Sequence, residues 1–223
     1  MHQTRILLLC LFATGLTLHG QTPAPKVGYL RFWNMLPPQN GDFELCKAGA
    51  PESEGNLLSG TAYRYSSYAE FPSTRYRLVV FKKGDRTTPL KTFDVDLRPN
   101  TFFTVLVSPQ GGAINVELLN DTLDPKAESG TLTVRNYFPG LTVAVLSETR
   151  KVVDALPYGN TNSVNGFPLS RVPLTLQTRL PNGTPAESGT EADFRASKRA
   201  TLLIIPDSYG RFRPRVAIDG KNL

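Results

Sequence analysis

Basic side chains recur at every second residue near the end of the 223-residue chain, at Arg211, Arg213 and Arg215. Further basic residues lie shortly before them, at Arg195, Lys198 and Arg199. On an extended strand, side chains two residues apart share one face about 7 Å apart, so the three guanidinium groups form a row. Arginine presents a planar fork of donors that fits carboxylates and phosphates. The pattern is compatible with a surface for a carboxylated or phosphorylated polymer, such as an anionic polysaccharide, or for an acidic protein. We favour the other interpretation, an exposed edge strand that its charge keeps soluble.

The positive charge of the chain is concentrated in its second part. Residues 21–128 carry 12 Lys and Arg against 12 Asp and Glu, whereas residues 129–223 carry 12 against 7. Nearly all of the net charge of +6 at pH 7 therefore lies after residue 128. We do not expect nucleic acid as the partner, because the basic stretch lacks the aromatic platforms of strand-stacking sites and the chain carries an export signal, described below.

A second candidate surface is aromatic and consists of Tyr63, Tyr65 and Tyr68. Aromatic rings with a polar edge stack on the faces of sugars, so a carbohydrate site is the alternative interpretation of this cluster. We favour ordinary sheet packing, because Tyr63 and Tyr65 would share one face of a strand.

Two carboxylates, Asp94 and Asp96, stand two residues apart on an expected strand. Paired carboxylates hydrolyse glycosides, but such pairs flank a cleft between distant elements, and nothing in the sequence marks one here. Asp96 also opens a D-[LF]-R motif that recurs at Asp193, which favours a turn or an ion pair of the fold. The chain has no G-x-S-x-G, phosphate-binding loop, S-x-x-K or EF-hand motif. We predict no catalytic residue, no cofactor and no metal site, and rank a carboxylate-dependent hydrolase last.

Residues 1–20 have the features of a secretory signal peptide, with Arg5 ahead of a 13-residue apolar stretch at 6–18. This stretch is too short to span a bilayer, which takes about 20 residues; the alternative is an uncleaved anchor. We therefore expect a periplasmic or secreted protein whose mature chain has no transmembrane segment.

Cleavage near Gly20 would leave a chain without histidine and with a single cysteine, because the signal segment contains His2, Cys10 and His19. A chain without imidazole cannot build a Ser-His-Asp or Cys-His arrangement or a histidine metal site. The remaining Cys46 cannot form an internal disulfide; we expect it to be buried in a strand, and the alternative is an intermolecular disulfide. These counts predict a protein that binds and does not catalyse.

The rest of the chain contains a repeat of four motifs. The pattern L-x-[FV]-x-N-x-[LF]-P begins at Leu30 and Leu132, and F-P-x-x-R-x-x-L begins at Phe71 and Phe167. The D-[LF]-R motif begins at Asp96 and Asp193, and T-[VL]-L-[VI] begins at Thr104 and Thr201. The order is the same in both copies, at offsets of 96 to 102 residues. The repeat predicts domains at 27–121 and 130–220, joined by a polar connector at 121–129.

Alternating apolar residues and turn sequences predict short strands throughout. After an opening strand at 30–34, the first domain has expected strands at 43–46, 62–68, 76–81, 92–97, 102–107 and 114–119. After 132–136, the second has expected strands at 141–146, 152–156, 163–167, 174–177, 200–205 and 211–217. About seven short strands per hundred residues predict two tandem immunoglobulin-like β-sandwich domains in an all-β protein.

The order of several short motifs also carries a family resemblance. Residues 65–72 (Y-S-S-Y-A-E-F-P) lead to Tyr76 through a hydroxyl pair, an aromatic residue and a hydrophobic-Pro step. Residues 97–105 (L-R-P-N-T-F-F-T-V) join a polar turn to a strand of aromatic residues, Thr and Val. With the two opening strands and residues 165–169, these motifs resemble the periplasmic alginate O-acetylation accessory (AlgF-like) family over nearly the whole mature chain. Residues 48–60 depart from it as an insertion-like stretch.

The resemblance implies a non-catalytic partner in the acetylation of an exported polysaccharide. Such proteins work beside a membrane O-acyltransferase and catalytic periplasmic proteins, which would be the protein partners. It transfers no site residue to this chain. We expect an exported adaptor or scaffold in exopolysaccharide O-acetylation; the alternative is a carbohydrate-binding or cell-surface interaction module that uses the arginine row or the tyrosine cluster.

Overall fold

In the computed structural model, the described residues are 26–50, 55–148, 150–180, 182–207 and 209–220. The predicted signal peptide at 1–20 lies outside them. Most of the described chain is strand, and its helical parts are a short 3₁₀ helix, η1 (Pro38–Asn40), and one helical turn, α2 (Phe194–Ser197). Within this part of the chain, no helix is long and apolar enough to cross a membrane.

Residues 27–120, which we call the first half, form two sheets. One has the order β4-β1-β8-β9, with β5 also paired to β1: β1 (Val27–Asn34), β4 (Arg64–Tyr65), β5 (Ala69–Pro72), β8 (Phe102–Gln110) and β9 (Ala113–Asn120). The other has the order β3-β2-β6-β7: β2 (Phe43–Lys47), β3 (Asn56–Gly60), β6 (Thr74–Lys82) and β7 (Lys91–Leu97).

Residues 130–218, the second half, form two further sheets. One has the order β13-β10-β16-β17: β10 (Gly130–Asn136), β13 (Thr161–Phe167), β16 (Arg199–Pro206) and β17 (Phe212–Ile218). The other has the order β12-β11-β14-β15: β11 (Val143–Ser147), β12 (Arg150–Leu156), β14 (Arg171–Arg179) and β15 (Pro185–Asp193). In each half the first strand runs parallel to the last strand but one, β1 to β8 and β10 to β16.

Each half encloses an apolar core between its two sheets. In the first half, Leu30 and Phe32 of β1 pack with residues of β2, β6, β7 and β8. In the second, Leu132 and Val134 of β10 hold the matching place. The alternation of the sequence predicted these inward-facing positions. The prediction of an all-β protein is confirmed, and the paired sheets are consistent with β-sandwiches.

The asparagine of the first repeated motif has the same role in both halves. Asn34 and Asn136 are completely buried at the ends of β1 and β10. The Asn34 amide donates to the carbonyls of Gly41 and Gly60, and Asn136 donates to those of Leu141 and Leu156. Each side-chain oxygen accepts the backbone N–H two residues later. Because a buried amide must be hydrogen-bonded, this residue ties the strand end to the neighbouring loop.

The D-[LF]-R motif forms an ion pair in both halves. Arg98 Nε donates to Asp96 at 2.8 Å, and Arg195 Nε donates to Asp193 at 2.9 Å. The middle residue lies against a glycine two positions before the first motif. A Cβ atom on Gly28 would lie 2.5 Å from Leu97 Cγ, and one on Gly130 would lie 2.6 Å from Phe194 Cγ. The motif is therefore a packing and turn element, as the sequence favoured.

Three local expectations differ from the structure. The strand expected at 62–68 is only Arg64–Tyr65, because Tyr63 has φ 51° and turns the chain before it. Residues 48–60 contain β3, an edge strand of the second sheet. The polar strand β15 was not predicted, because its sequence lacks the apolar alternation of the others.

Cys46 is buried on β2, as expected, with 3% of its surface exposed.

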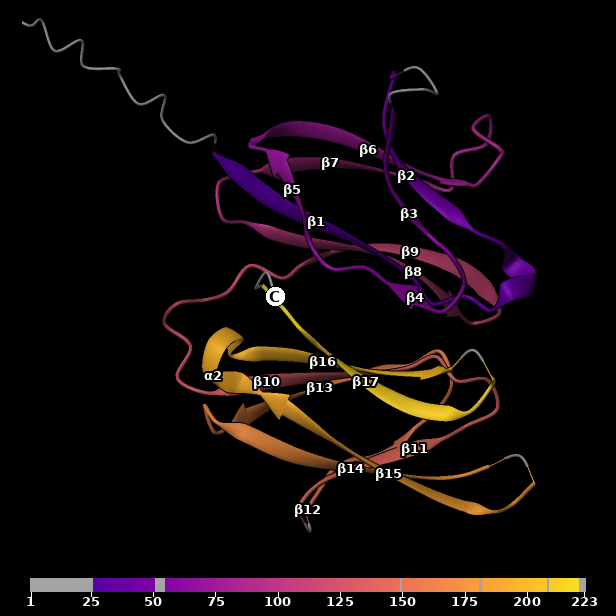
Figure 1. Ribbon diagram of the computed structural model, residues 1–223, viewed down its shortest axis with the longest axis vertical. Helices are drawn as coiled ribbons and strands as arrows, with labels where there is room; N and C mark the ends of the chain where they lie inside the picture. Colours follow the sequence, from indigo (N-terminus) through magenta and orange to yellow (C-terminus); the bar gives the residue numbers. More distant parts are fainter. Residues whose placement is uncertain (1–25, 51–54, 149, 181, 208, 221–223) are drawn as a thin grey trace, which may run out of the picture.

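The two halves stack face to face, so that the four sheets form four successive layers (Figure 1). The sheet with β8 and β9 faces the sheet with β16 and β17. A third apolar cluster lies at this contact, composed of Trp33, Met35, Leu106, Tyr137, Leu203, Ile205 and Ala217. β1 is thus buried on both faces, which its simple alternation did not indicate.

Candidate functional site: a cleft between the halves

A cleft of about 720 Å³ opens where the beginning of β17 meets the turn before β4. The first half contributes Pro38, Ala62, Tyr63, Arg64 and Tyr65. The second half contributes Ile205, Pro206, Asp207, Tyr209, Gly210, Arg211, Arg213 and Arg215. The arginine row and two of the three tyrosines, which the sequence offered as separate surfaces, therefore line one cleft.

The basic wall of the cleft is an edge strand. Among the described strands, β17 pairs only with β16, and Arg213 and Arg215 alternate along it with the half-buried Phe212 and Pro214. Phe212 packs on the core of the second half, so the two arginines point away from that core. The edge position that we favoured from the sequence is thus confirmed, and the same edge also faces the cleft.

The aromatic wall belongs to the first half. Tyr65 is 40% exposed, and its ring meets that of Trp33 edge-on at 6.4 Å. Tyr63 packs against the apolar cluster between the halves. Burial raises the pKa of Tyr63 to about 12, and Tyr158 adds to the rise, so the phenol keeps its proton. These rings present apolar faces beside hydroxyl donors, the combination that binds a sugar ring.

Asp207 is the acidic residue among those that line the cleft. Arg211 Nε lies 2.9 Å and Arg213 Nε 3.5 Å from Asp207 Oδ2. Burial favours a higher pKa for Asp207, but backbone N–H groups of Arg211 and Tyr209 and the Arg211 guanidinium outweigh it and hold the pKa below its usual range. Asp207 thus stays ionised and orients two of the arginines.

The other two arginines of the cleft, Arg64 and Arg215, come from opposite halves. No ion pair between described residues involves either of them. The exposed ring of Tyr209 lies under the Arg211 guanidinium at 4.8 Å. The cleft therefore offers guanidinium donors on both walls to an anion that enters it.

The remaining basic candidates lie at the opposite end of β16. Arg195 is paired with Asp193 at α2. Lys198 donates to the carbonyls of Pro125 and Ala127 at 2.9 and 2.7 Å, and Arg199 donates to that of Asn120 at 3.1 Å. Lys198 and Arg199 thus hold the chain at the connector, Arg195 is bound to its neighbour Asp193, and none of the three lines the cleft.

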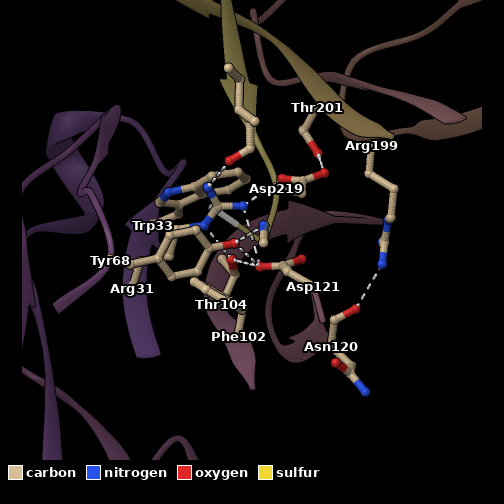
Figure 2. Close-up of polar contacts among 12 residues, drawn as sticks. Arg31, Trp33, Tyr68, Phe102, Thr104, Asn120, Asp121, Arg199, Thr201 and Asp219 are labelled. Atoms are coloured by element: carbon tan, nitrogen blue, oxygen red, sulfur yellow. Dashed lines mark hydrogen bonds and ion pairs between the residues drawn. The ribbon is translucent and has the colours of Figure 1, made fainter. Parts of the chain in front are cut away.

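The third tyrosine, Tyr68, belongs to a buried junction around Arg31 (Figure 2). The Arg31 guanidinium lies 3.9 Å from the centre of the Trp33 ring and 4.2 Å from that of Tyr68. Its Nη2 donates to Asp219 Oδ1 at 2.6 Å and to Asp121 Oδ2 at 3.3 Å. Arg31 of the first half therefore binds two carboxylates: Asp121, which follows the last strand of the first half, and Asp219, which follows the last strand of the second half.

Hydroxyl groups complete this junction. Thr104 accepts from Arg31 Nε and donates to Asp121, and Thr201 donates to Asp219 Oδ2 at 2.9 Å. Tyr68 donates to Asp121 at 2.8 Å and accepts from the backbone N–H of Gly220 at 3.1 Å. Burial raises the pKa of Tyr68 far above its usual value, so this phenol remains a donor. The junction is a continuous hydrogen-bonded network in which Arg31, Asp121 and Asp219 are buried and Tyr68 is partly buried.

Sequence reasoning did not identify the junction, although the repeat contains part of its signal. Thr104 and Thr201 open matching motifs, and an aspartate follows the last strand of each half, at Asp121 and Asp219. Arg31 has no counterpart, because Thr133 occupies its place in the second copy. Asp121 had been assigned to a polar connector, yet it is 3% exposed.

The other carboxylate pair takes no part in either site. Asp94 and Asp96 lie on β7 opposite Arg77 and Arg75 of β6 and are exposed. Over the described residues, no three His, Cys, Asp or Glu side chains are grouped as they would be to hold a metal ion.

Comparison with known proteins does not place the chain in a family. The chain matches no model of a known protein family and no curated protein. The resemblance to the alginate O-acetylation accessory family therefore rests on the short motifs alone.

Proposed function

We propose that this protein is an exported, non-catalytic binding protein with two tandem immunoglobulin-like β-sandwich domains, and that it holds a segment of acidic polysaccharide in the cleft between the halves. The observation that carries the proposal is that Arg213, Arg215 and Arg64 share one cleft with Tyr63 and Tyr65. Guanidinium groups pair with sugar carboxylates, and the rings stack on sugar faces. A site of about 720 Å³ that opens at a surface is large enough for a few sugar units of a chain.

The direct test is calorimetric titration of the mature protein with an oligouronate and with a neutral oligosaccharide of the same length. The triple variant Arg211→Ala, Arg213→Ala, Arg215→Ala removes the basic wall, and we expect at least about tenfold weaker binding of the oligouronate. A matched control, Arg150→Ala, Lys151→Ala, Arg171→Ala, removes three charges from another face of the second half. Equal losses in both variants would show nonspecific attraction, and unchanged binding in the first would show that β17 is only a soluble edge.

The adaptor role in exopolysaccharide O-acetylation is the second proposal, and the motif resemblance together with the absence of histidine after residue 20 favours it. Acetyl transfer to a hydroxyl ordinarily uses a nucleophile activated by a base such as histidine, so the chemistry would belong to partner proteins. Co-purification from cells should capture a membrane O-acyltransferase or its periplasmic partners. A neighbouring gene for such an enzyme would support the adaptor, whereas a neighbouring lyase or glycosidase gene would favour the binding module alone.

A further inference from the structure

Two buried carboxylates share one guanidinium at the contact between the halves. The side chains of Arg31, Asp121 and Asp219 are at most 4% exposed. With both carboxylates ionised, the group carries one net negative charge away from water. An enclosed charge without a counter-ion is costly, so the group gains by binding one proton.

The surroundings of Asp121 make it the carboxyl group that takes this proton. Burial raises its pKa, Arg31 opposes the rise, and the charge of Asp219 adds to it. Hydrogen bonds from Thr104 and Tyr68 lower the pKa but do not cancel the effect of burial. Arg199 is a further charged group near Asp121, and its guanidinium is bound to the backbone carbonyl of Asn120, the residue before Asp121.

We infer that the Arg31 junction is a proton-responsive lock between the two halves: one proton on Asp121 cancels the buried charge and tightens their docking, and its loss loosens them. The sign follows from linkage. A group whose pKa is higher in the folded than in the unfolded chain contributes stability that is complete below the unfolded value, 3.8 for Asp, and is lost as the pH rises through the folded value. The docked state is therefore favoured on the acidic side.

Both walls of the cleft are attached to this lock. Trp33, stacked on Arg31, donates from Nε1 to the carbonyl of Ser66 at 3.2 Å and contacts Tyr65 edge-on. Asp219 directly follows β17, which carries the basic wall. Loosening the junction would change the separation of the walls. This second step, in which anion binding tightens as the pH falls, rests on the proposed function of the cleft.

The junction contains its own reporter, because Trp33 is the single tryptophan of the chain. The full mature chain, without ligand, is titrated from acidic to alkaline pH while the tryptophan emission and the thermal midpoint are recorded. In the wild type, we expect the emission to shift to longer wavelength and the midpoint to fall as Asp121 loses its proton. In Asp121→Asn both responses should be absent, whereas Asp94→Asn, an exposed control on β7, should keep the wild-type curve.

A second variant keeps the test decisive if Asp121→Asn does not fold. Asp219→Asn leaves one carboxylate for one guanidinium, so the response should move to lower pH, with a tenfold change in proton affinity for each unit of displacement. Flat emission in the wild type, or the same response in all variants, would overturn the lock.

Binding of the oligouronate is then measured on both sides of the emission midpoint. We expect several-fold tighter binding on the acidic side in the wild type and no difference in Asp121→Asn. An identical pH dependence in the two proteins would overturn the coupling to the cleft. Absence of binding at every pH would refute the proposed function, while the ligand-free emission curve would still decide the lock.

Discussion

β9 and β17 are the last strands of the two halves and take the same edge position in equivalent sheets. Glu117 of β9 lies opposite Leu106, and Arg215 of β17 lies opposite Leu203, the matching residue of the repeated motif. Equivalent positions therefore carry opposite charges. Glu117 is used within the molecule, 3.9 Å from Arg135 of the other half, whereas Arg215 faces the open cleft. The strand arrangement therefore repeats between the halves, whereas the charges at equivalent positions differ.

β1 and β10 show the same divergence at the buried contact. Arg31 lies beside Thr104 in the parallel pair of the first half, and Thr133 lies beside Thr201 in the second. One arginine serves the aspartates of both halves, so the contact is asymmetric although its parts are repeated.

The sharpest way to test this asymmetry is to remove Arg31. Arg31→Met leaves two buried carboxylates without a cation, and we expect the free energy of unfolding to fall by about 3 to 5 kcal/mol. Thr133→Val removes only a hydroxyl contact with Ser163, and should cost about 1 kcal/mol. Denaturant titration of both variants measures the difference; equal losses would contradict the unequal roles.

The two buried asparagines should respond alike to mutation, because they make the same set of hydrogen bonds in the two halves. Asn34→Ala and Asn136→Ala each leave two carbonyls and one N–H without their partner. We expect a loss of about 2 to 4 kcal/mol for either, measured by urea unfolding. A large loss in one half and none in the other would break the equivalence.

Substitution of the two glycines that contact the D-[LF]-R motif tests its packing role. A methyl group at Gly28 or Gly130 would overlap Leu97 or Phe194, so Gly28→Ala and Gly130→Ala should each lower the unfolding free energy by about 1 to 3 kcal/mol. Gly189 offers a control, since nothing lies within 4 Å of a Cβ there. Thermal unfolding midpoints of both alanine variants equal to that of the wild type, measured by calorimetry, would rule out the packing role.

The edge strands give the smallest and most specific contrast. Arg215→Glu should weaken oligouronate binding about tenfold by reversing one charge of the cleft. Glu117→Ala, at the matching position of β9, should leave affinity unchanged because it lies outside the cleft lining. Titration calorimetry at two salt concentrations separates a local contact from the general attraction of a basic protein.

Local patterns predicted much of the strand content and the inward faces. β2, β7 and β16 lie within a residue or two of the expected ranges, because apolar residues alternate in β2 and β7 and form a short continuous run in β16, and both patterns favour strands. β15 was missed because Pro, Gly, Ser and Glu dominate it. Its pairing with all nine residues of β14 supplies the order that its own side chains do not.

The candidate site was predictable in its parts and not in its assembly. Arg213, Arg215 and Tyr65 could each be selected by residue type, since guanidinium and aromatic groups have recognisable chemistry. Their meeting depends on how one half docks on the other, and contacts between residues about 150 positions apart leave no local periodicity. Arg31 was overlooked for the same reason: alternation on β1 suggests an outward charge, and the second half covers it.

Composition and spacing were sufficient for the all-β class and for the matching motifs, because side-chain alternation and turn chemistry act over a few residues. The placement of charge was settled by the contact between the halves. That contact buries Arg31, which alternation places on the outer face of β1, and pairs it with Asp121, which the sequence placed in the connector. It also makes the edge strand β17 one wall of the cleft. Burial changes the energy of a charge, and burial is a property of the assembled layers.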